Sequence, residues 1–549
     1  MLANEIPTTV QEELVQVCIH AHFYQPPREN PFTGLIPAEV GAEPYANFNE
    51  KITAECYRPN AEAGNFEFIS FNFGPTLAAW LEQNDPETYA RVIAADKANY
   101  AKYGYGNALA QVYNHVIMPL SHPEDARMQI EWGITDFVQR FGHKPEGMWL
   151  AETAVNFQVL EMLAEAGIKF TILAPWQAHH DSVFTIDPGE RAAQQGRLRT
   201  YLLRELQHLF NGNEKLNWAA LEALERAIIP ERFNPNEPYR VTLRNGKSIV
   251  VFFYNGPLSG GISFDQWATI NADTFARDWI LPQVNIDKLT NKEAQLITIA
   301  TDGELYGHHQ SYRELFLQHL VTNSTKSAGM GVTFLSHWLQ QHPPLRQVRI
   351  VEGTSWSCFH GVKRWGEGCD CSPGDTAWKG HLRAAFDLLA TETDRIYNNL
   401  APRLFNEPHA AIREWLLVYL GKENEAEFAK RHLQARHVKG EFDKEWAVAK
   451  RLLQAQVYKH QMYTSCAWFF EDIDRIEPKN ALAAASITLH LLGQLVRGDV
   501  RHQFEAELAQ ARSNQRSQHT GLQLYRKGVR WSLRHAREVA AHEMLKDEG

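Results

Sequence analysis

The stretch VCIHAHFYQPPRENPFTG, Val17 to Gly34, decides the fold class, because an apolar run ends there in His20 and His22 before a Pro-Pro break. Continuous apolar runs followed by helix-like segments indicate parallel strands buried on both faces. Seven such units predict a closed β/α barrel of seven or eight repeats, with a doubly wound open sheet as the alternative. The other six runs are FEFISFNFG, the stretch from Tyr103 to Ala110, EGMWLAE, KFTILAPW, IVVFFYNG and QLITIATDGE.

The composition is that of a folded protein, with 44% hydrophobic and 22% charged residues in a chain of 549. An excess of 65 acidic over 55 basic residues, a net charge of −10, gives no support for binding nucleic acid or anionic membranes. The first residues lack the pattern of a secretory signal, and no segment approaches about 18 uninterrupted apolar residues. We expect a cytoplasmic protein with no nucleic-acid or membrane partner, and the sequence leaves its oligomeric state open.

The pattern changes beyond about Pro373, where apolar residues such as Trp378, Leu382 and Phe386 recur at helical spacing. We predict a β/α barrel over residues 1–372, with a helical insertion at about 181–239 over its mouth. Residues 373–549 are predicted to form an α-helical C-terminal domain that contributes to the cleft.

Two segments place carboxylates at the ends of apolar runs: GMWLAETAVN carries Glu152, and ITIATDGELYGHH carries Asp302 and Glu304. In a barrel these ends face one pocket. A pair of carboxyl groups performs glycoside cleavage, with retention when they are about 5 to 5.5 Å apart and with inversion when the gap is wider. Asp302 and Glu304 are two residues apart and point to the same side of a strand, so their spacing does not decide which is the acid.

Five ordered segments resemble the signature regions of glycoside hydrolase family 57: HAHFYQP, GNALAQVYNHVIMPL, GMWLAE, IATDGELYGHH and MYTSCAWFFEDI. The resemblance implies a (β/α)7 barrel that acts on α-glucans with retention of configuration, as α-amylases and 4-α-glucanotransferases do. The long helical C-terminal half is typical of an uncharacterised branch of this family. No cofactor is expected, and the expected partner is an α-glucan or maltooligosaccharide substrate.

By motif position, the resemblance makes Glu152 the nucleophile and Asp302 the general acid/base. Asp302 must start protonated, and burial beside Glu152 would raise its pKa. His20 and His22 would line the subsite of the cleaved sugar, with Trp149 and Trp468 as stacking walls. The full set of expected substrate-binding residues is His20, His22, Gln25, Trp149, Trp176, Glu304, His308, Trp356, Trp365 and Trp468.

The segment TSWSCFHGVKRWGEGCDCSPG places four metal-binding side chains close together, namely Cys358, His360, Cys369 and Cys371. The C-x-H and C-x-C spacings are tighter than the usual spacing of zinc ligands. We therefore expect no metal, and a loop that packs thiols while offering Trp356, Trp365 and Arg364 to the substrate. A structural metal site is the alternative.

Two other functions remain open from the residues alone. An H-x-H after the first strand and an Asp after the last also begin a binuclear metal site, as in metal-dependent barrel hydrolases. Such a site needs further ligands, and His115, His179 and His180 are the candidates. The second alternative is a non-catalytic glucan-binding protein that keeps the pocket without turnover.

Overall fold

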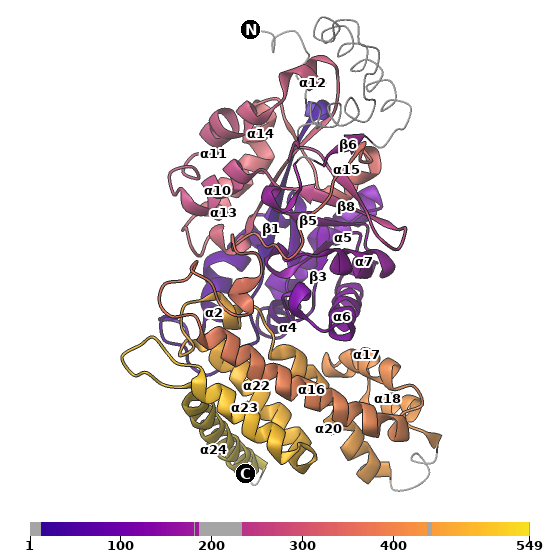
Figure 1. The fold of residues 1–549 in the computed structure, drawn as a ribbon. Coiled ribbons are helices and arrows are strands. Elements are labelled where there is room, and N and C mark those ends of the chain that lie inside the picture. The colour runs from indigo at the N-terminus through magenta and orange to yellow at the C-terminus, as the bar shows by residue number, and fades with distance from the viewer. Residues whose placement is uncertain (1–11, 181, 186–232, 436–441, 548–549) are drawn as a thin grey trace, which may run out of the picture.

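The structure, a computed structural model, describes residues 12–180, 182–185, 233–435 and 442–547. Figure 1 shows a β/α half that contains the strands and, below it, a half made of helices. Most of the insertion predicted at about 181–239 lies outside the described residues.

The main sheet is built from parallel strands that follow one another in the barrel order. Strands β9 (Gln295–Asp302), β1 (Val15–Phe23), β2 (Ser70–Phe73), β3 (Ala108–Gln111) and β4 (Met148–Trp149) pair in that sequence. A parallel bridge between Gly147 and Phe170 continues to β5 (Phe170–Leu173), which pairs with β8 (Ser248–Phe253). These seven strands are the seven predicted apolar runs, so the prediction of a (β/α)7 barrel is confirmed.

The barrel is distorted between β8 and β9. In the described part of the chain these two strands form no ladder, and the backbone N–H of Asn255 donates to the carbonyl of Thr298 at 2.6 Å. Short strands extend the sheet elsewhere: β6 (Phe184–Thr185), β7 (Tyr239–Thr242), β10 (Gly331–Val332) and β11 (Arg346–Gln347).

Strand β1 shows why these runs are apolar throughout. Val17, Ile19 and Ala21 belong to the hydrophobic core shared with the surrounding helices. Cys18 instead packs with side chains from β3, β4, β5, β8 and β9, including Trp149, and this second cluster fills the barrel interior. Because side chains alternate along a strand, His20 and His22 also face the interior, above Cys18.

Helices connect the parallel strands and cover the outside of the barrel (Figure 1). The longest are α5 (Pro86–Tyr103) and α6 (Pro123–Phe141). The Asp85 side chain accepts a hydrogen bond from the backbone N–H of Thr88 and so caps the start of α5. The other helices of this half are α2 (Phe48–Ile52), α3 (Arg58–Glu62), α4 (Pro75–Asn84), α7 (Phe157–Glu165), α10 (Gly256–Phe264), α11 (Ala272–Thr274), α12 (Ile286–Thr290), α13 (Arg313–His319), α14 (Thr325–Ser327) and α15 (Leu335–Gln341).

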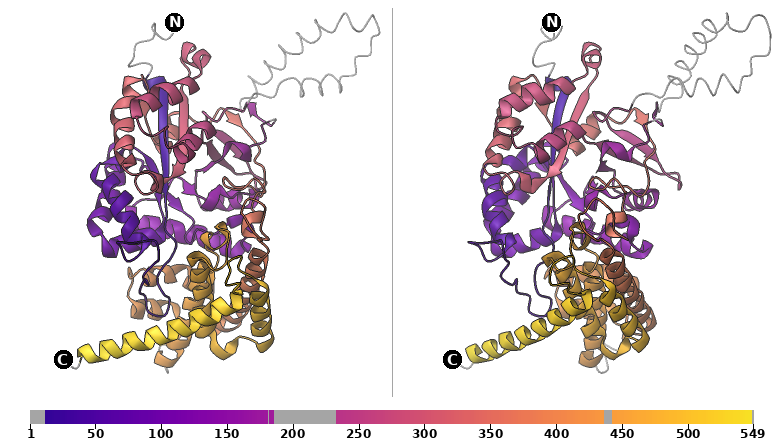
Figure 2. Two further views of the ribbon diagram at one scale, coloured as in Figure 1. Left: turned by 90° about the vertical axis from the view of Figure 1, so that its left-hand side faces the viewer. Right: turned by 60° about the vertical axis from the view of Figure 1, so that its left-hand side comes forward.

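The C-terminal half is helical, as predicted, and Figure 2 shows it below the barrel in both views. A domain boundary at residues 372–373 stays a prediction. The helices are α16 (Trp378–Leu404), α17 (Pro408–Tyr419), α18 (Glu425–His432), α20 (Phe442–Gln461), α21 (Cys466–Phe469), α22 (Ile476–Leu492), α23 (Gly498–Gln510) and α24 (Gly521–Asp547).

Buried polar contacts join the two halves. The Lys459 ammonium on α20 contacts Asp125 on α6 at 2.6 Å and Asp394 on α16 at 2.7 Å. The backbone N–H of Ser465 donates to the carbonyl of His115, which follows β3. The helical half therefore packs on the end of the barrel where the strands carry their polar residues.

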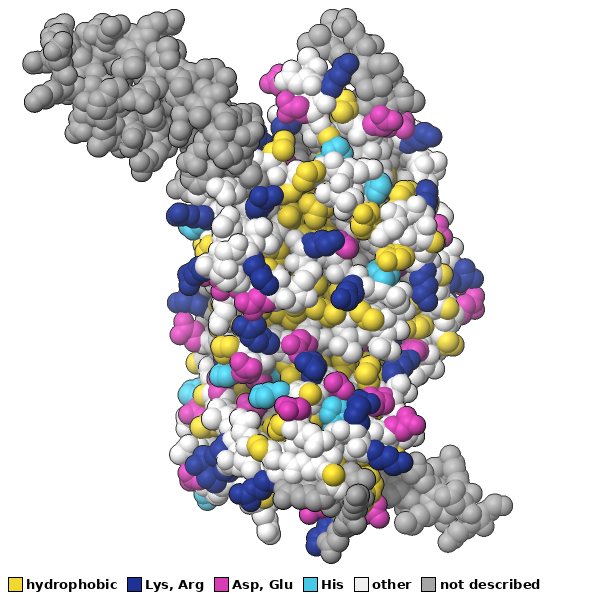
Figure 3. Space-filling model, turned by 90° about the vertical axis from the view of Figure 1, so that its right-hand side faces the viewer, with side chains coloured by type: hydrophobic (Ala, Val, Ile, Leu, Met, Phe, Trp, Pro, Cys, Tyr) yellow, Lys and Arg dark blue, Asp and Glu magenta, His cyan; other side chains and the backbone are white. Residues whose placement is uncertain are grey.

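Charged side chains of both signs occur together on the surface of the molecule. On the face shown in Figure 3, basic and acidic side chains are interspersed rather than gathered by sign. Across the described residues, we find no helix with the length and apolar character needed to cross a membrane.

Candidate active site

A cavity of about 750 Å³ opens at the carboxyl ends of the strands, between the barrel and the helical half. Its size is in the range of small-molecule sites. The walls come from the end of β1, the turns after β3, β4 and β9, the loop before α2, and the segment around α21 and α22. Residues that matter for the chemistry below are His22, His115, Glu152, Asp302, Glu304 and Arg475.

Glu152 lies in the turn that follows β4, with a strained backbone. Its φ of 56° and the φ of 49° at Thr153 both fall in the left-handed region, which costs a non-glycine residue about 1–3 kcal/mol. The carboxylate Oε2 accepts hydrogen bonds from Trp356 Nε1 at 2.9 Å and from Ser357 Oγ at 2.6 Å. The strained turn and these two donors fix the direction in which Glu152 enters the cavity.

The same contacts oppose the effect of burial on the pKa of Glu152, which stays above its usual value. Burial raises its pKa, while the Ser357 hydroxyl, the Trp356 indole and the Arg364 guanidinium each lower it by stabilising the ionised form. In the described part of the chain, the side-chain hydrogen bonds found for this carboxylate both end on Oε2. Oε1 is the oxygen left to face a substrate.

Asp302 has a contrasting environment at the end of β9, where it is in register with His22 of β1. Among the described residues we find no hydrogen-bond donor to its carboxylate. Its side chain is open to the cavity. Desolvation by the surrounding walls, then the neighbouring carboxylates of Glu304 and Glu152, raise its pKa well above the usual range. Asp302 therefore favours the protonated form, while Glu152 is held by donors that favour the ionised form.

Glu304 is not on the strand with Asp302, because β9 ends at Asp302 and Glu304 lies in the turn Gly303–Leu305. The expectation that both carboxylates lie on one side of a strand is therefore wrong. Glu304 Oε1 accepts from the backbone N–H of Tyr24 at 3.1 Å and from Tyr57 Oη at 2.7 Å. Burial raises its pKa to about 7, against the opposing effect of these donors.

Buried histidines lie at the floor of the cavity, where His22 and His115 line it and His20 lies in the core beside them. His20 Nδ1 lies 3.1 Å from Ser70 Oγ and its Nε2 lies 3.2 Å from Asn72 Oδ1. His22 also contacts Asn72, and its Nε2 lies 3.1 Å from Nε2 of His115. Burial lowers the pKa of His20 to about 3 and of His22 to about 4, and lowers the pKa of His115 well below its usual range. Burial therefore favours the neutral form of all three rings.

The cavity is completed by the helical half. His115 Nδ1 lies 2.7 Å from Ser465 Oγ, and Val116 forms an isolated bridge with Thr464. Phe469, Phe470 and Arg475 line the side opposite the barrel, with the Arg475 guanidinium 3.9 Å from the centre of the Phe470 ring. The C-terminal half therefore contributes to the cavity.

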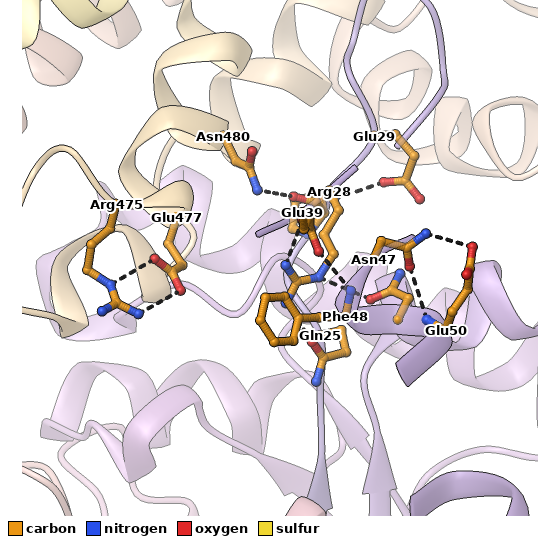
Figure 4. Close-up of polar contacts among 12 residues, drawn as sticks. Gln25, Arg28, Glu29, Glu39, Asn47, Phe48, Glu50, Arg475, Glu477 and Asn480 are labelled. Atoms are coloured by element: carbon orange, nitrogen blue, oxygen red, sulfur yellow. Dashed lines mark hydrogen bonds and ion pairs between the residues drawn. The ribbon is translucent and has the colours of Figure 1, made fainter. Parts of the chain in front are cut away.

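The rim is built around Arg28, shown in Figure 4. Its guanidinium pairs with Glu39 at 2.9 Å, donates to Gln25 Oε1 at 2.8 Å and lies 5.4 Å from the Phe48 ring. Gln25 in turn donates to Tyr57 Oη at 2.9 Å, and Tyr57 donates to Glu304. This chain of hydrogen bonds connects the rim with Glu304, in the turn that follows β9.

The twelve predicted site residues occupy three kinds of position. Six line the cavity: His22, Gln25, Glu152, Asp302, Glu304 and His308. Two are outside the cavity lining: Trp356, which donates a hydrogen bond to Glu152, and Trp176, which is 40% exposed on the loop after β5. The other four are fully buried: His20, Trp149, Trp365 and Trp468.

The prediction that Trp149 and Trp468 form stacking walls, and that Trp365 contacts the substrate, is wrong for this structure, because these rings expose no surface. Trp149 stacks on His20 and His22 with ring centres 4.9 Å apart in each case. Trp468 donates to the carbonyl of Lys379 within the helical half. Large aromatic rings often serve as core, and sequence does not distinguish that role from a stacking wall.

Several site residues were missed from the sequence. Asn72 interrupts the apolar run FEFISFNFG, and this polar residue in a buried strand was a usable signal. Ser357, Tyr57 and Arg28 carry no such signal, since each is brought to the site from a loop or helix. His115 was considered only as a metal ligand.

In the described part of the chain, the residues proposed for a binuclear metal site do not come together as a set of ligands. His20, His22 and His115 bond to serine, asparagine and one another, and no side-chain hydrogen bond joins their rings to Asp302. His179 and His180 are exposed on the loop after β5. Within the described ranges, the group that could hold a metal is the Cys358, His360, Cys369 and Cys371 cluster, outside this cavity.

Comparison with known proteins identifies the barrel. A family model described as glycosyl hydrolase family 57 matches residues 29–350, and a domain of unknown function, DUF3536, matches residues 375–547. Alpha-amylase 1 of Dictyoglomus thermophilum is 28% identical over 150 residues, which are 26% of this chain and 20% of the amylase. The 4-alpha-glucanotransferase of Thermococcus litoralis is 25% identical over 138 residues, 24% of this chain and 20% of that enzyme.

Each match therefore spans about a fifth of the length of the curated relative. Among solved structures, an exo-type maltose-forming amylase from Pyrococcus sp. ST04 superposes with a TM-score of 0.66 at 15% identity, covering 90% of this chain and 83% of the amylase. At this identity, the likeness shows only that the folds are similar. The family model, in contrast, matches the sequence over more than half of the chain. The chain is a member of glycosyl hydrolase family 57 with a helical C-terminal domain of unknown function.

Proposed function

We propose that this protein cleaves α-glucans with retention of configuration and passes the released glycosyl unit to water or to another sugar. The observation that carries the proposal is the pair Glu152 and Asp302, which enter one cavity from two strand ends. Two hydrogen-bond donors favour the ionised form of Glu152, whereas neighbouring carboxylates favour the protonated form of Asp302. The names of the two curated relatives, an alpha-amylase and a 4-alpha-glucanotransferase, support the α-glucan class.

In the first step, the ionised Glu152 attacks the anomeric carbon through Oε1 while protonated Asp302 gives its proton to the departing glycosidic oxygen. This forms a bond between the enzyme and the sugar and breaks the glycosidic bond. In the second step, Asp302 removes a proton from water or from an acceptor hydroxyl, and the new oxygen displaces Glu152. Each step inverts the configuration at the anomeric carbon, so the two steps together retain it.

The neighbouring residues have supporting roles in this proposal. Ser357 and Trp356 keep Glu152 ionised and oriented, and Glu304 helps to keep Asp302 protonated by its negative charge. His22, Gln25, His308 and the Arg475 side of the cavity offer polar groups to sugar hydroxyls. The buried His20 and Trp149 hold His22 in place rather than contact the sugar.

The test is incubation with maltooligosaccharides, with chromatography of the products over time. Longer and shorter chains together show transfer, and shorter chains alone show hydrolysis. Glu152→Gln is expected to bind the oligosaccharide but to lose turnover. A control, Glu87→Gln, changes an exposed glutamate of α5 and should leave turnover unchanged.

Unchanged turnover in Glu152→Gln would refute the assignment of the nucleophile. Binding of maltooligosaccharides without any turnover by the unaltered protein would favour the non-catalytic glucan-binding alternative. NMR of the first product formed, before mutarotation, tests retention: an α-anomer supports the double displacement and a β-anomer contradicts it. We further propose that the protein acts in the cytoplasm.

A further inference from the structure

The loop that precedes the helical half gathers four metal-binding side chains at one point. Cys358 Sγ lies 3.5 Å from Cys369 Sγ and 3.8 Å from Cys371 Sγ, and His360 Nδ1 lies 3.2 Å from Cys371 Sγ. All four ligand atoms lie within 4.8 Å of one another. The sequence spacing argued against a metal, but the fold brings the C-x-H and C-x-C pairs face to face.

These distances fit a metal centre better than a disulfide. A disulfide needs sulfur atoms about 2.05 Å apart, and the cysteines here are free. A tetrahedron with zinc–sulfur bonds of about 2.3 Å has sulfur–sulfur edges of about 3.8 Å. Three thiolates and one imidazole form one of the usual ligand sets of structural zinc.

The backbone of both pairs is held by close packing. Gly361, next to His360, has a φ of 73°, and a Cβ there would lie 2.1 Å from the carbonyl of Gly353. Gly368, next to Cys369, has a φ of 93°, and a Cβ would lie 2.5 Å from Thr376 Oγ1. The surrounding chain therefore fixes the backbone beside the Cys358–His360 pair and beside the Cys369–Cys371 pair.

Buried positive charge lies beside the cluster. Lys379 is fully buried, and among the described residues its ammonium has no hydrogen-bond partner. It is within electrostatic range of Cys358 and Cys369, and Arg364 lies beside Cys371. Three thiolates around a divalent ion carry one net negative charge, which would balance a buried ammonium that is otherwise costly.

We propose that Cys358, His360, Cys369 and Cys371 bind one structural zinc ion. Cys358 follows directly on Trp356 and Ser357, the two donors to Glu152. The ion would tie this segment to the start of the helical half and so hold the donors in place. Cys358 and Cys369 are buried while Cys371 is half-buried and His360 is exposed, so the ion can enter from the His360 side.

Metal binding is tested without reference to activity, so its failure is distinct from failure of the proposed glucan chemistry. The full-length protein, purified without chelator, is analysed by mass spectrometry for metals. We expect about one zinc per chain. Cys371→Ser should lose most of the zinc, while Cys466→Ser, a cysteine outside the cluster, should keep it.

A second measurement covers the case in which Cys371→Ser does not fold. Cobalt(II) exchanged into the unaltered protein should give the intense visible absorption of tetrahedral thiolate coordination. The proposal is overturned by metal-free protein with three reactive thiols in the cluster, by a disulfide within it, by iron in place of zinc, or by full zinc content in folded Cys371→Ser.

Discussion

Replacing Ser357 by alanine removes one of the two hydrogen bonds to Glu152 Oε2, the shorter one at 2.6 Å. A hydrogen bond to a charged group contributes about 1.5–3 kcal/mol. The bond stabilises the ionised carboxylate, so its loss raises the pKa of Glu152, which burial already raises. The proposed reaction needs Glu152 to be ionised in the free enzyme. Removing the hydrogen bond should therefore reduce activity at acidic pH.

The expected result is a shift of the acidic limb of kcat/KM to higher pH by about one to two pH units. On that limb the rate falls about ten- to a hundredfold, while the plateau changes less because Trp356 Nε1 still orients the carboxylate. The assay is the pH profile of kcat/KM on a maltooligosaccharide. Ser357→Thr, which keeps the hydroxyl, should behave as the unaltered enzyme, and Ser355→Ala, whose hydroxyl bonds to the Gly361 carbonyl, should leave the limb in place. An acidic limb that does not move in Ser357→Ala refutes the role given to this hydrogen bond.

Three further predictions follow from the same structure. Glu304→Gln removes the neighbouring charge that helps to raise the pKa of Asp302, so the alkaline limb of the pH profile should move to lower pH. Lys459→Met leaves Asp125 and Asp394 without their cation and should lower the free energy of unfolding by about 3 kcal/mol, measured by denaturant titration. The three neutral histidines of the cavity floor bind protons only in the unfolded chain, so stability should fall as pH drops below about 6.5, by about 2 kcal/mol for each ring at pH 5.

Each of these has an outcome that contradicts it. An alkaline limb that stays in place in Glu304→Gln means that the charge of Glu304 does not act on Asp302. Adding Asp125→Asn and Asp394→Asn to Lys459→Met should restore part of the lost stability, and no recovery means that the loss comes from packing. A melting temperature that is the same at pH 7 and pH 5 contradicts the buried neutral histidines.

Most of the seven strands were predictable because a strand buried on both faces leaves a largely apolar run in the sequence, as β1 and β9 do. Glu152 and Asp302 were predictable as a pair because each closes such a run, and parallel strands bring their ends together. The sequence also indicated that helices follow Pro373, through the spacing of residues such as Trp378 and Leu382.

What the sequence did not reveal depends on contacts between distant segments. Ser357 reaches Glu152 across 205 positions, and Tyr57 reaches Glu304 across 247. The prediction that Trp365 and Trp468 contact the substrate was also wrong because of a distant segment. Both residues lie in motifs near the site, but the helical half covers their rings. A local sequence pattern indicates which face of a helix or strand is buried. The contacts of Ser357 and Tyr57 and the burial of the two tryptophans depend on which other segment packs against that face.

The contact between His115 and Ser465 spans 350 positions and has a consequence for the newly made chain. At the usual speed of synthesis, about 5–20 residues per second, the ribosome needs about 20 to 70 s to go from one residue to the other. The last barrel strand, β9, ends at Asp302, so only the final 163 residues of this interval, about 8 to 33 s, are added after all seven barrel strands have been made. Throughout the interval the His115–His22 pair has no support from Ser465, and the wall formed by Phe469 and Phe470 does not yet exist. A partly synthesised chain therefore has its two carboxylates long before it has an enclosed place for a sugar between them.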